Sequence, residues 1–212
     1  MTEWRVENWL SDSPHRAIEY SEYWNDEQNE QDKAWNILDG DFTKMESYLA
    51  QIGLVEDLRE CLDACRARRG SGLGGVGIDL AAGNLWAAPH LLGSGDIEKL
   101  YCLEFSKHRL LKLGPKVLEH YQVPNDKVVL VYGSFYDLHL ADGSVDFALL
   151  SAAFHHAEDP NRLLSEIRRV LKPDGVLMVI GEHIVPEPYS LGYLKVCAKH
   201  VAKAVIAAST PA

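Results

Sequence analysis

The chain has 212 residues, of which 47% are hydrophobic and 25% are charged. This length and composition suit one domain with an appendage and allow a buried core, which excludes wholesale disorder. The net charge is −10, from 31 acidic and 21 basic residues, whereas a protein that binds nucleic-acid phosphates needs a basic surface. The sequence has no apolar stretch near the ~20 residues that span a bilayer, and its start does not resemble a signal peptide. With four scattered cysteines, we expect a cytoplasmic protein that binds neither nucleic acid nor membrane.

The first 40 residues have a composition of their own, with ten acidic and three basic residues and four of the five tryptophans. Because disordered acidic tails lack aromatic residues, we expect a folded element here. Residues 54–69 then follow a helical pattern, with Cys61 and Cys65 on its apolar face. No second Cys or His pair lies nearby, so we interpret these thiols as core residues and predict no metal site. Residues 1–70 are thus predicted to form a helical, aromatic-rich cap that covers the main domain or lends aromatic surface to a substrate pocket.

Short apolar runs alternate with amphipathic stretches over residues 71–185. The predicted strands are 76–80, 100–104, 127–132, 147–151 and 175–180, and the predicted helices are 86–92, 107–120 and 161–171. Strands that are apolar almost throughout and separated by helices indicate a parallel sheet covered on both faces. The expected fold class is therefore α/β, a Rossmann-like, doubly wound and mostly parallel sheet.

Two glycine-containing segments compete for the role of a nucleotide-binding turn. Gly72, Gly74 and Gly77 satisfy the dinucleotide pattern of an NAD enzyme, but they precede a strand where that pattern must follow one. We interpret them as a flexible joint. The segment that begins at Asp79 is better placed, because an acidic residue near the end of a buried strand is followed by a small-residue turn into a helix. Glu104 ends the next strand, 25 residues later, where a carboxylate meets ribose hydroxyls in such folds.

Three further motifs follow in order, at residues 142–147, 154–160 and 164–175. Together with the turn at Asp79 and with Glu104, they resemble the class I S-adenosylmethionine-dependent methyltransferases, in particular the small-molecule methyltransferases often labelled type 11. The resemblance covers about residues 76–182. It implies S-adenosylmethionine as cofactor and methyl transfer to a small-molecule acceptor. A non-catalytic binding module or subunit with the same fold is the alternative.

The resemblance also implies a set of cofactor-binding residues. Asp79 would lie near the methionine amino end, Glu104 would hold the ribose, and Ser134 and Phe135 would lie beside the adenine. The full set is Asp79, Ala81, Gly83, Glu104, Ser134, Phe135 and Ser151.

Methyl transfer requires a general base only where the acceptor must lose a proton. His156 and His183 are the candidates, since histidine titrates near neutral pH; His155 adjoins the first. The remaining possibilities are that no dedicated base is used or that the N-terminal segment supplies one.

The sequence departs from the family at several positions. Ala81 and Leu85 replace turn glycines, and Ser134 replaces an aspartate. We expect these changes to weaken cofactor binding at most, provided that Ala81 keeps a negative φ. Residues 186–212 are predicted to form one C-terminal helix, which leaves no room for the hairpin that usually completes the sheet. Either the chain is truncated or its sheet stops at five strands and the helix covers the edge. Neither the acceptor nor the oligomeric state can be read from the sequence.

Overall fold

The computed structural model describes residues 3–10 and 33–182. Residues 1–182 belong to one compact unit and residues 183–212 to another. The predicted C-terminal helix over residues 186–212 and the candidate base His183 lie outside the described residues.

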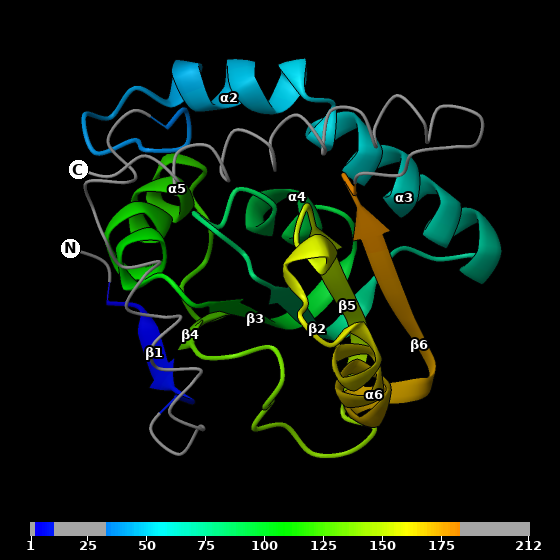
Figure 1. The fold of residues 1–212 in the computed structure, drawn as a ribbon. Coiled ribbons are helices and arrows are strands. Elements are labelled where there is room, and N and C mark those ends of the chain that lie inside the picture. Colours follow the sequence, from blue (N-terminus) through cyan, green and yellow to red (C-terminus); the bar gives the residue numbers. More distant parts are fainter. Residues whose placement is uncertain (1–2, 11–32, 183–212) are drawn as a thin grey trace, which may run out of the picture. The chain divides into compact units, whose positions relative to one another are not determined.

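The described chain is built around a six-stranded sheet in the order β1-β4-β3-β2-β5-β6, with every paired strand parallel. Its central strands are continuous apolar runs, which suits a sheet buried on both faces. This confirms the predicted α/β, Rossmann-like parallel fold (Figure 1). In chain order the strands are β1 (Arg5–Asn8), β2 (Gly74–Leu80), β3 (Asp96–Glu104), β4 (Val128–Tyr132), β5 (Val145–Ser151) and β6 (Leu171–Ile180).

Strand β1 corrects the prediction of a five-stranded sheet and of an N-terminal region without strands. It pairs with β4 from Arg5 opposite Val129 to Asn8 opposite Tyr132. Three of its four residues are exposed, among them Val6, its one apolar side chain, so this short strand has no run of buried apolar residues that would have marked it. It joins the sheet through backbone pairing with a strand about 120 residues away.

The helices lie on both faces of the sheet (Figure 1). Side chains from α2, α3, α4 and α5 share one core with alternate strand residues such as Phe147 and Leu149. Ala148 and Leu150, which point the other way, pack with α6 and with Trp9. Because successive side chains of β5 point to opposite faces, this strand contributes residues to both cores, as a doubly wound sheet requires. The helices are α2 (Phe42–Gln51), α3 (Leu54–Arg69), α4 (Ala88–Leu92), α5 (Gly114–His120) and α6 (Pro160–Val170).

The predicted helix over residues 107–120 is split into two kinds of helix. His108–Leu113, labelled η2, is a π-helix, and α5 continues from Gly114. A π-helical turn widens the backbone within a helix, and such turns often occur at functional sites. The apolar periodicity of a π-turn is too close to that of an α-helix to be read from sequence.

Two of the three glycines that we interpreted as a flexible joint belong to a strand. Gly74 and Gly77 lie within β2, and a Cβ at Gly77 would stand 2.0 Å from the Phe147 ring of the adjacent strand. Gly77 therefore allows close packing against β5, and neither glycine belongs to the helix-opening turn of an NAD site.

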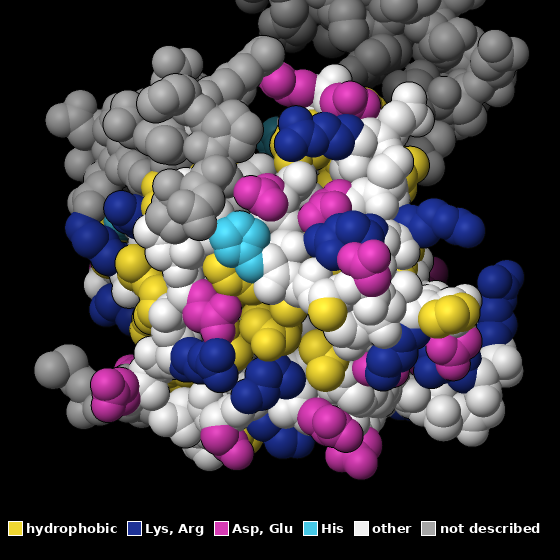
Figure 2. Space-filling view, turned by 90° about the horizontal axis from the view of Figure 1, so that it is seen from below, with side chains coloured by type: hydrophobic (Ala, Val, Ile, Leu, Met, Phe, Trp, Pro, Cys, Tyr) yellow, Lys and Arg dark blue, Asp and Glu magenta, His cyan; other side chains and the backbone are white. Residues whose placement is uncertain are grey.

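No helix among the described residues is both long and apolar enough to cross a membrane. On the face shown in Figure 2, basic and acidic side chains alternate around exposed hydrophobic ones. This mixture is that of an ordinary solvated surface.

Candidate functional site

All six strands are parallel, so their carboxyl ends lie along one edge of the sheet. In open α/β sheets ligands bind outside this edge. The structure places the segments that follow β2, β3, β4 and β5 there. Four of the predicted cofactor residues lie in these segments: Ala81, Gly83, Ser134 and Phe135. The other three lie at strand ends, Glu104 and Ser151 as the last residues of β3 and β5 and Asp79 as the residue before the last of β2. The candidate site is therefore built from loops that are far apart in sequence.

The turn after β2 keeps a glycine-like backbone although two of its three glycines are replaced. Ala81, Gly83 and Leu85 have φ angles of 56°, 58° and 68°. The condition under which alanine would cost the cofactor little room, a negative φ at Ala81, is therefore not met. A left-handed conformation costs an L-residue about 1–2 kcal/mol, and the surrounding contacts must hold it. Leu85 is fully buried and packs against Gly114, where a Cβ would stand 2.5 Å from the leucine Cδ1.

Glu104 joins the turns that follow β2 and β3. Its Oε2 accepts a hydrogen bond from the Gly83 amide at 2.7 Å, and its Oε1 accepts from the Phe105 and Ser106 amides, each at 2.8 Å. The side chain is buried, at 5% exposure. Since each carboxylate oxygen has two lone pairs, Oε2 keeps one acceptor site beside Gly83. A Cβ at Gly83 would meet nothing within 4 Å, so space is open beside the glycine that donates to this carboxylate.

Asp79 is a buried carboxyl near the end of β2. It is 1% exposed, and among the described residues its Oδ2 has no hydrogen-bond partner. Burial, and secondly the charge of Glu104, raise the pKa of Asp79 to about 8. A carboxyl with such a pKa is a candidate functional group, because a cation beside it would restore its charge.

The loop after β4, residues 133–140, holds Ser134 and Phe135; we call it the β4 loop. Ser134 is buried, and its hydroxyl accepts a hydrogen bond from the Tyr136 amide at 3.3 Å. The Phe135 ring packs in the core that α6 covers. Ser134 therefore lies at the sheet edge, while the Phe135 ring supports the loop from beneath.

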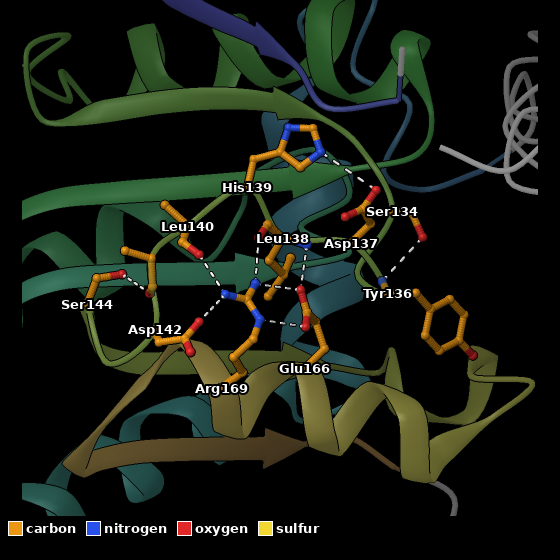
Figure 3. A network of polar contacts seen from close by, with 11 residues as sticks. Ser134, Tyr136, Asp137, Leu138, His139, Leu140, Asp142, Ser144, Glu166 and Arg169 are labelled. Atoms are coloured by element: carbon orange, nitrogen blue, oxygen red, sulfur yellow. Dashed lines mark hydrogen bonds and ion pairs between the residues drawn. The ribbon is translucent and has the colours of Figure 1, made fainter. Parts of the chain in front are cut away.

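The β4 loop is fixed by an ion pair on α6 that sequence reasoning missed. Arg169 donates to the carbonyl oxygens of Leu138 and Leu140, at 2.7 and 2.8 Å, and forms two hydrogen bonds with Glu166. Glu166 in turn accepts from the Leu138 amide at 2.8 Å. Figure 3 shows this pair on one side of the loop and the His139 ring on the other side. The sequence offered no sign of these contacts beyond the amphipathic helix itself.

The loop after β5 is held by Glu182, a second residue that sequence reasoning did not select. Glu182 accepts from the amides of Ala153 and Phe154, at 2.8 and 2.7 Å, and from His155 Nδ1 at 2.9 Å. Burial opposes its ionisation, but these contacts prevail and lower its pKa. Its place directly after a buried strand was the available signal.

His156 lies on this same loop, and Ser151 is the last residue of β5, just before it. The His156 ring is 4.2 Å from that of His155. Burial, followed by the charges of His155 and Arg109, lowers the pKa of His156. The Ser151 hydroxyl is buried, and within the described residues it has no hydrogen-bond partner.

The N-terminal region reaches the turn after β2 through Trp35. The buried Asn84 side chain donates to the Trp35 carbonyl oxygen at 3.1 Å. The Trp35 ring lies 5.3 Å from the Arg109 guanidinium, and Tyr48 lies beside it at 5.8 Å. An aromatic surface from the predicted cap thus adjoins the candidate site.

Residues 78–179 match the protein family described as "Methyltransferase domain". Human thiol S-methyltransferase TMT1B is 33% identical over 92 residues, which are 43% of this chain and 36% of that protein. Demethylmenaquinone methyltransferase of Clavibacter sepedonicus is 30% identical over 133 residues, which are 60% of this chain and 51% of that one. The chain thus spans about half the length, or less, of these relatives.

Solved structures agree on the fold. A proposed S-adenosylmethionine-dependent methyltransferase from Methanococcus maripaludis superimposes with a TM-score of 0.55 at 21% identity, over 65% of this chain and 61% of that one. A methyltransferase from Leishmania major gives 0.52 at 16% identity, over 76% and 58% of the two chains. The ordered motifs and the family match identify residues 78–179 as a methyltransferase domain, and the parallel sheet has the fold of the class I methyltransferases that use S-adenosylmethionine.

Proposed function

We propose that this chain transfers a methyl group from S-adenosylmethionine to a small-molecule acceptor. The observation that carries the proposal is the pair of buried carboxyls, Asp79 and Glu104, at the ends of adjacent strands beside a turn with left-handed backbone. When bound, the cofactor supplies a methyl group on a positively charged sulfur.

The polar groups of the site fit the chemistry of this cofactor, which carries an ammonium, a ribose diol and an adenine amino group. Asp79, with its unpartnered Oδ2 among the described residues, would pair with the ammonium. Glu104 would accept a ribose hydroxyl at the remaining site of Oε2, next to the open space at Gly83. Ser134 would accept from the adenine amino group, and the buried Ser151 hydroxyl would contact the methionine side.

The residues of the chain would act mainly by alignment and by exclusion of water. An in-line displacement needs the acceptor lone pair directed at the methyl carbon while the carbon–sulfur bond breaks, and positioning alone accounts for much of such a rate. For an acceptor that must lose a proton, His156 is the base we propose among the described residues, because its lowered pKa keeps the imidazole neutral at pH 7.

A small-molecule acceptor is favoured by charge and by the relatives. A protein of net charge −10 is a poor match for nucleic-acid phosphates. The two curated relatives are named for the methylation of a thiol and of demethylmenaquinone. The Trp35 ring beside Arg109 would offer an apolar and cationic surface to such an acceptor.

The proposal is tested by calorimetric titration with S-adenosylhomocysteine, the product, and by a methyl-transfer assay over a panel of thiols, phenols and quinols. Glu104→Gln should weaken product binding at least about tenfold, since a charge-assisted hydrogen bond contributes ~1.5–3 kcal/mol. Glu98→Gln, the same change at an exposed position of β3, is the matched control and should bind normally. Equal binding by both variants would contradict the role of Glu104. Tight product binding without turnover of any acceptor would favour the non-catalytic alternative.

A further inference from the structure

Strand β1 ends where the β4 loop begins. Its last pair joins Asn8 to Tyr132, and the next residue, Trp9, donates its amide to the Tyr132 carbonyl oxygen at 2.8 Å. The backbone of the N-terminal segment is thus hydrogen-bonded to the residue that directly precedes Gly133 and Ser134.

The Trp9 side chain contacts both ends of the β4 loop. Its indole is 4% exposed and stacks on His139, with ring centroids 5.5 Å apart and an interplanar angle of 20°. At the other end, a Cβ on Gly133 would stand 3.2 Å from the Trp9 Cβ. A second aromatic ring, that of Tyr101 on β3, lies 5.9 Å away. Trp9 therefore packs against the loop at two places, with its Cβ near Gly133 and its indole on His139.

The two supports of the loop lie on opposite sides. Arg169 and Glu166 bind its main chain at Leu138 and Leu140, and His139 points the other way (Figure 3), toward Trp9. The Arg169 side lies within the residues that match the methyltransferase family, 78–179. Trp9 lies outside them, so this support is an addition from the N-terminal segment.

We propose that Trp9 is a positioning residue for the adenine end of the cofactor site and that the pairing of β1 with β4 holds it in place. This inference depends on the proposed function, because it assigns the β4 loop, with Ser134, to the adenine. A loop held in its bound conformation before binding loses less conformational freedom when the cofactor arrives, so affinity rises without any added contact. Trp9 itself touches the loop and not the cofactor.

The test uses the full chain and titrations with S-adenosylhomocysteine. Trp9→Ala should raise the dissociation constant roughly tenfold, and Trp9→Phe, which keeps an aromatic ring under the loop, should restore most of the affinity. His139→Ala removes the stacking partner, whose side chain is 34% exposed, together with its contact to Asp137 Oδ2 at 3.6 Å, and should give a smaller loss in a folded protein.

Ile97→Ala is the matched control. Ile97 is fully buried in the same sheet, near the amino end of β3 and away from the loop, so this variant loses core packing alone. A second readout is the preference for S-adenosylhomocysteine over S-inosylhomocysteine, which lacks the adenine amino group. Trp9→Ala and His139→Ala should reduce this preference, and Ile97→Ala should not.

The outcomes separate the two proposals. If the wild type binds and the Trp9 and His139 variants bind like Ile97→Ala, with unchanged preference, the inference about Trp9 is overturned while the proposed function stands. If the wild type does not bind S-adenosylhomocysteine, the proposed function is overturned and the inference with it. Should Trp9→Ala fail to fold, Trp9→Phe and His139→Ala still decide the matter.

Discussion

Cofactor binding should release a proton from Asp79. Because burial and the nearby Glu104 raise the pKa of this carboxyl to about 8, about 0.9 of the molecules carry the proton at pH 7. If the cofactor ammonium pairs with Asp79, it favours the charged form and expels that proton. The predicted release is therefore about 0.9 proton at pH 7, and about 0.1 at pH 9, where the carboxyl is already ionised.

Calorimetry in buffers of different ionisation enthalpy counts these protons directly. The slope of the observed binding enthalpy against the buffer enthalpy gives the number released when S-adenosylhomocysteine binds. Asp79→Asn is the control, since it keeps the shape and cannot titrate, and the difference between wild type and variant removes the protons of the ligand itself. Equal slopes for the two proteins at pH 7 would refute the reasoning.

The same pKa predicts how the stability of the ligand-free protein depends on pH. With the folded value near 8 and the ordinary value at 3.8, the native state holds the proton more tightly than the unfolded chain. The free energy of unfolding should therefore fall as pH rises from about 4 to about 8 and stay level above. The fall in the free energy of unfolding between pH 4 and pH 7 is at most about 4 kcal/mol. Asp79→Asn should therefore be more stable than the wild type at pH 7. Its free energy of unfolding, measured by urea denaturation, should also vary less with pH.

Three further variants test the supports of the site. Ala81→Gly should raise the free energy of unfolding by about 0.5–1 kcal/mol in urea denaturation, because it relieves a left-handed alanine; Ala82→Gly, where φ is not positive, should lower it. Arg169→Ala should lower the free energy of unfolding by about 2–3 kcal/mol and weaken S-adenosylhomocysteine binding. Arg168→Ala, at an exposed position of the same helix, should have neither effect. Equal effects of the two variants would contradict the role given to Arg169. Glu182→Gln should lower turnover more than cofactor binding in steady-state kinetics, since it loosens the loop that carries His156.

Much of the architecture could be predicted because its signals are local. The central strands are unbroken apolar runs, and each helix shows its own periodicity, so the order of elements follows from short windows of sequence. In a parallel sheet the carboxyl ends meet at one edge. For this reason Asp79 and Glu104, at the ends of two such runs, could be placed together from sequence alone.

The supports of the site could not be predicted in this way. Arg169 and Glu182 look like ordinary charged residues of a helix and a strand end, and their partners lie about 30 residues away. Alanine by itself favours a negative φ, whereas Ala81 has a positive one. The contacts around the turn hold this conformation.

The sequence by itself determined the parallel α/β sheet, the methyltransferase motifs and the position of the buried carboxyls, because these depend on apolar patterning and strand ends. Only the tertiary structure decided that β1 joins β4, that Trp9 lies beneath the β4 loop and that Arg169 holds the loop from the opposite side. Those contacts join residues that are distant in the chain. Their free energy comes from burial and hydrogen bonds that exist only after the sheet has formed, so no short stretch of sequence contains them.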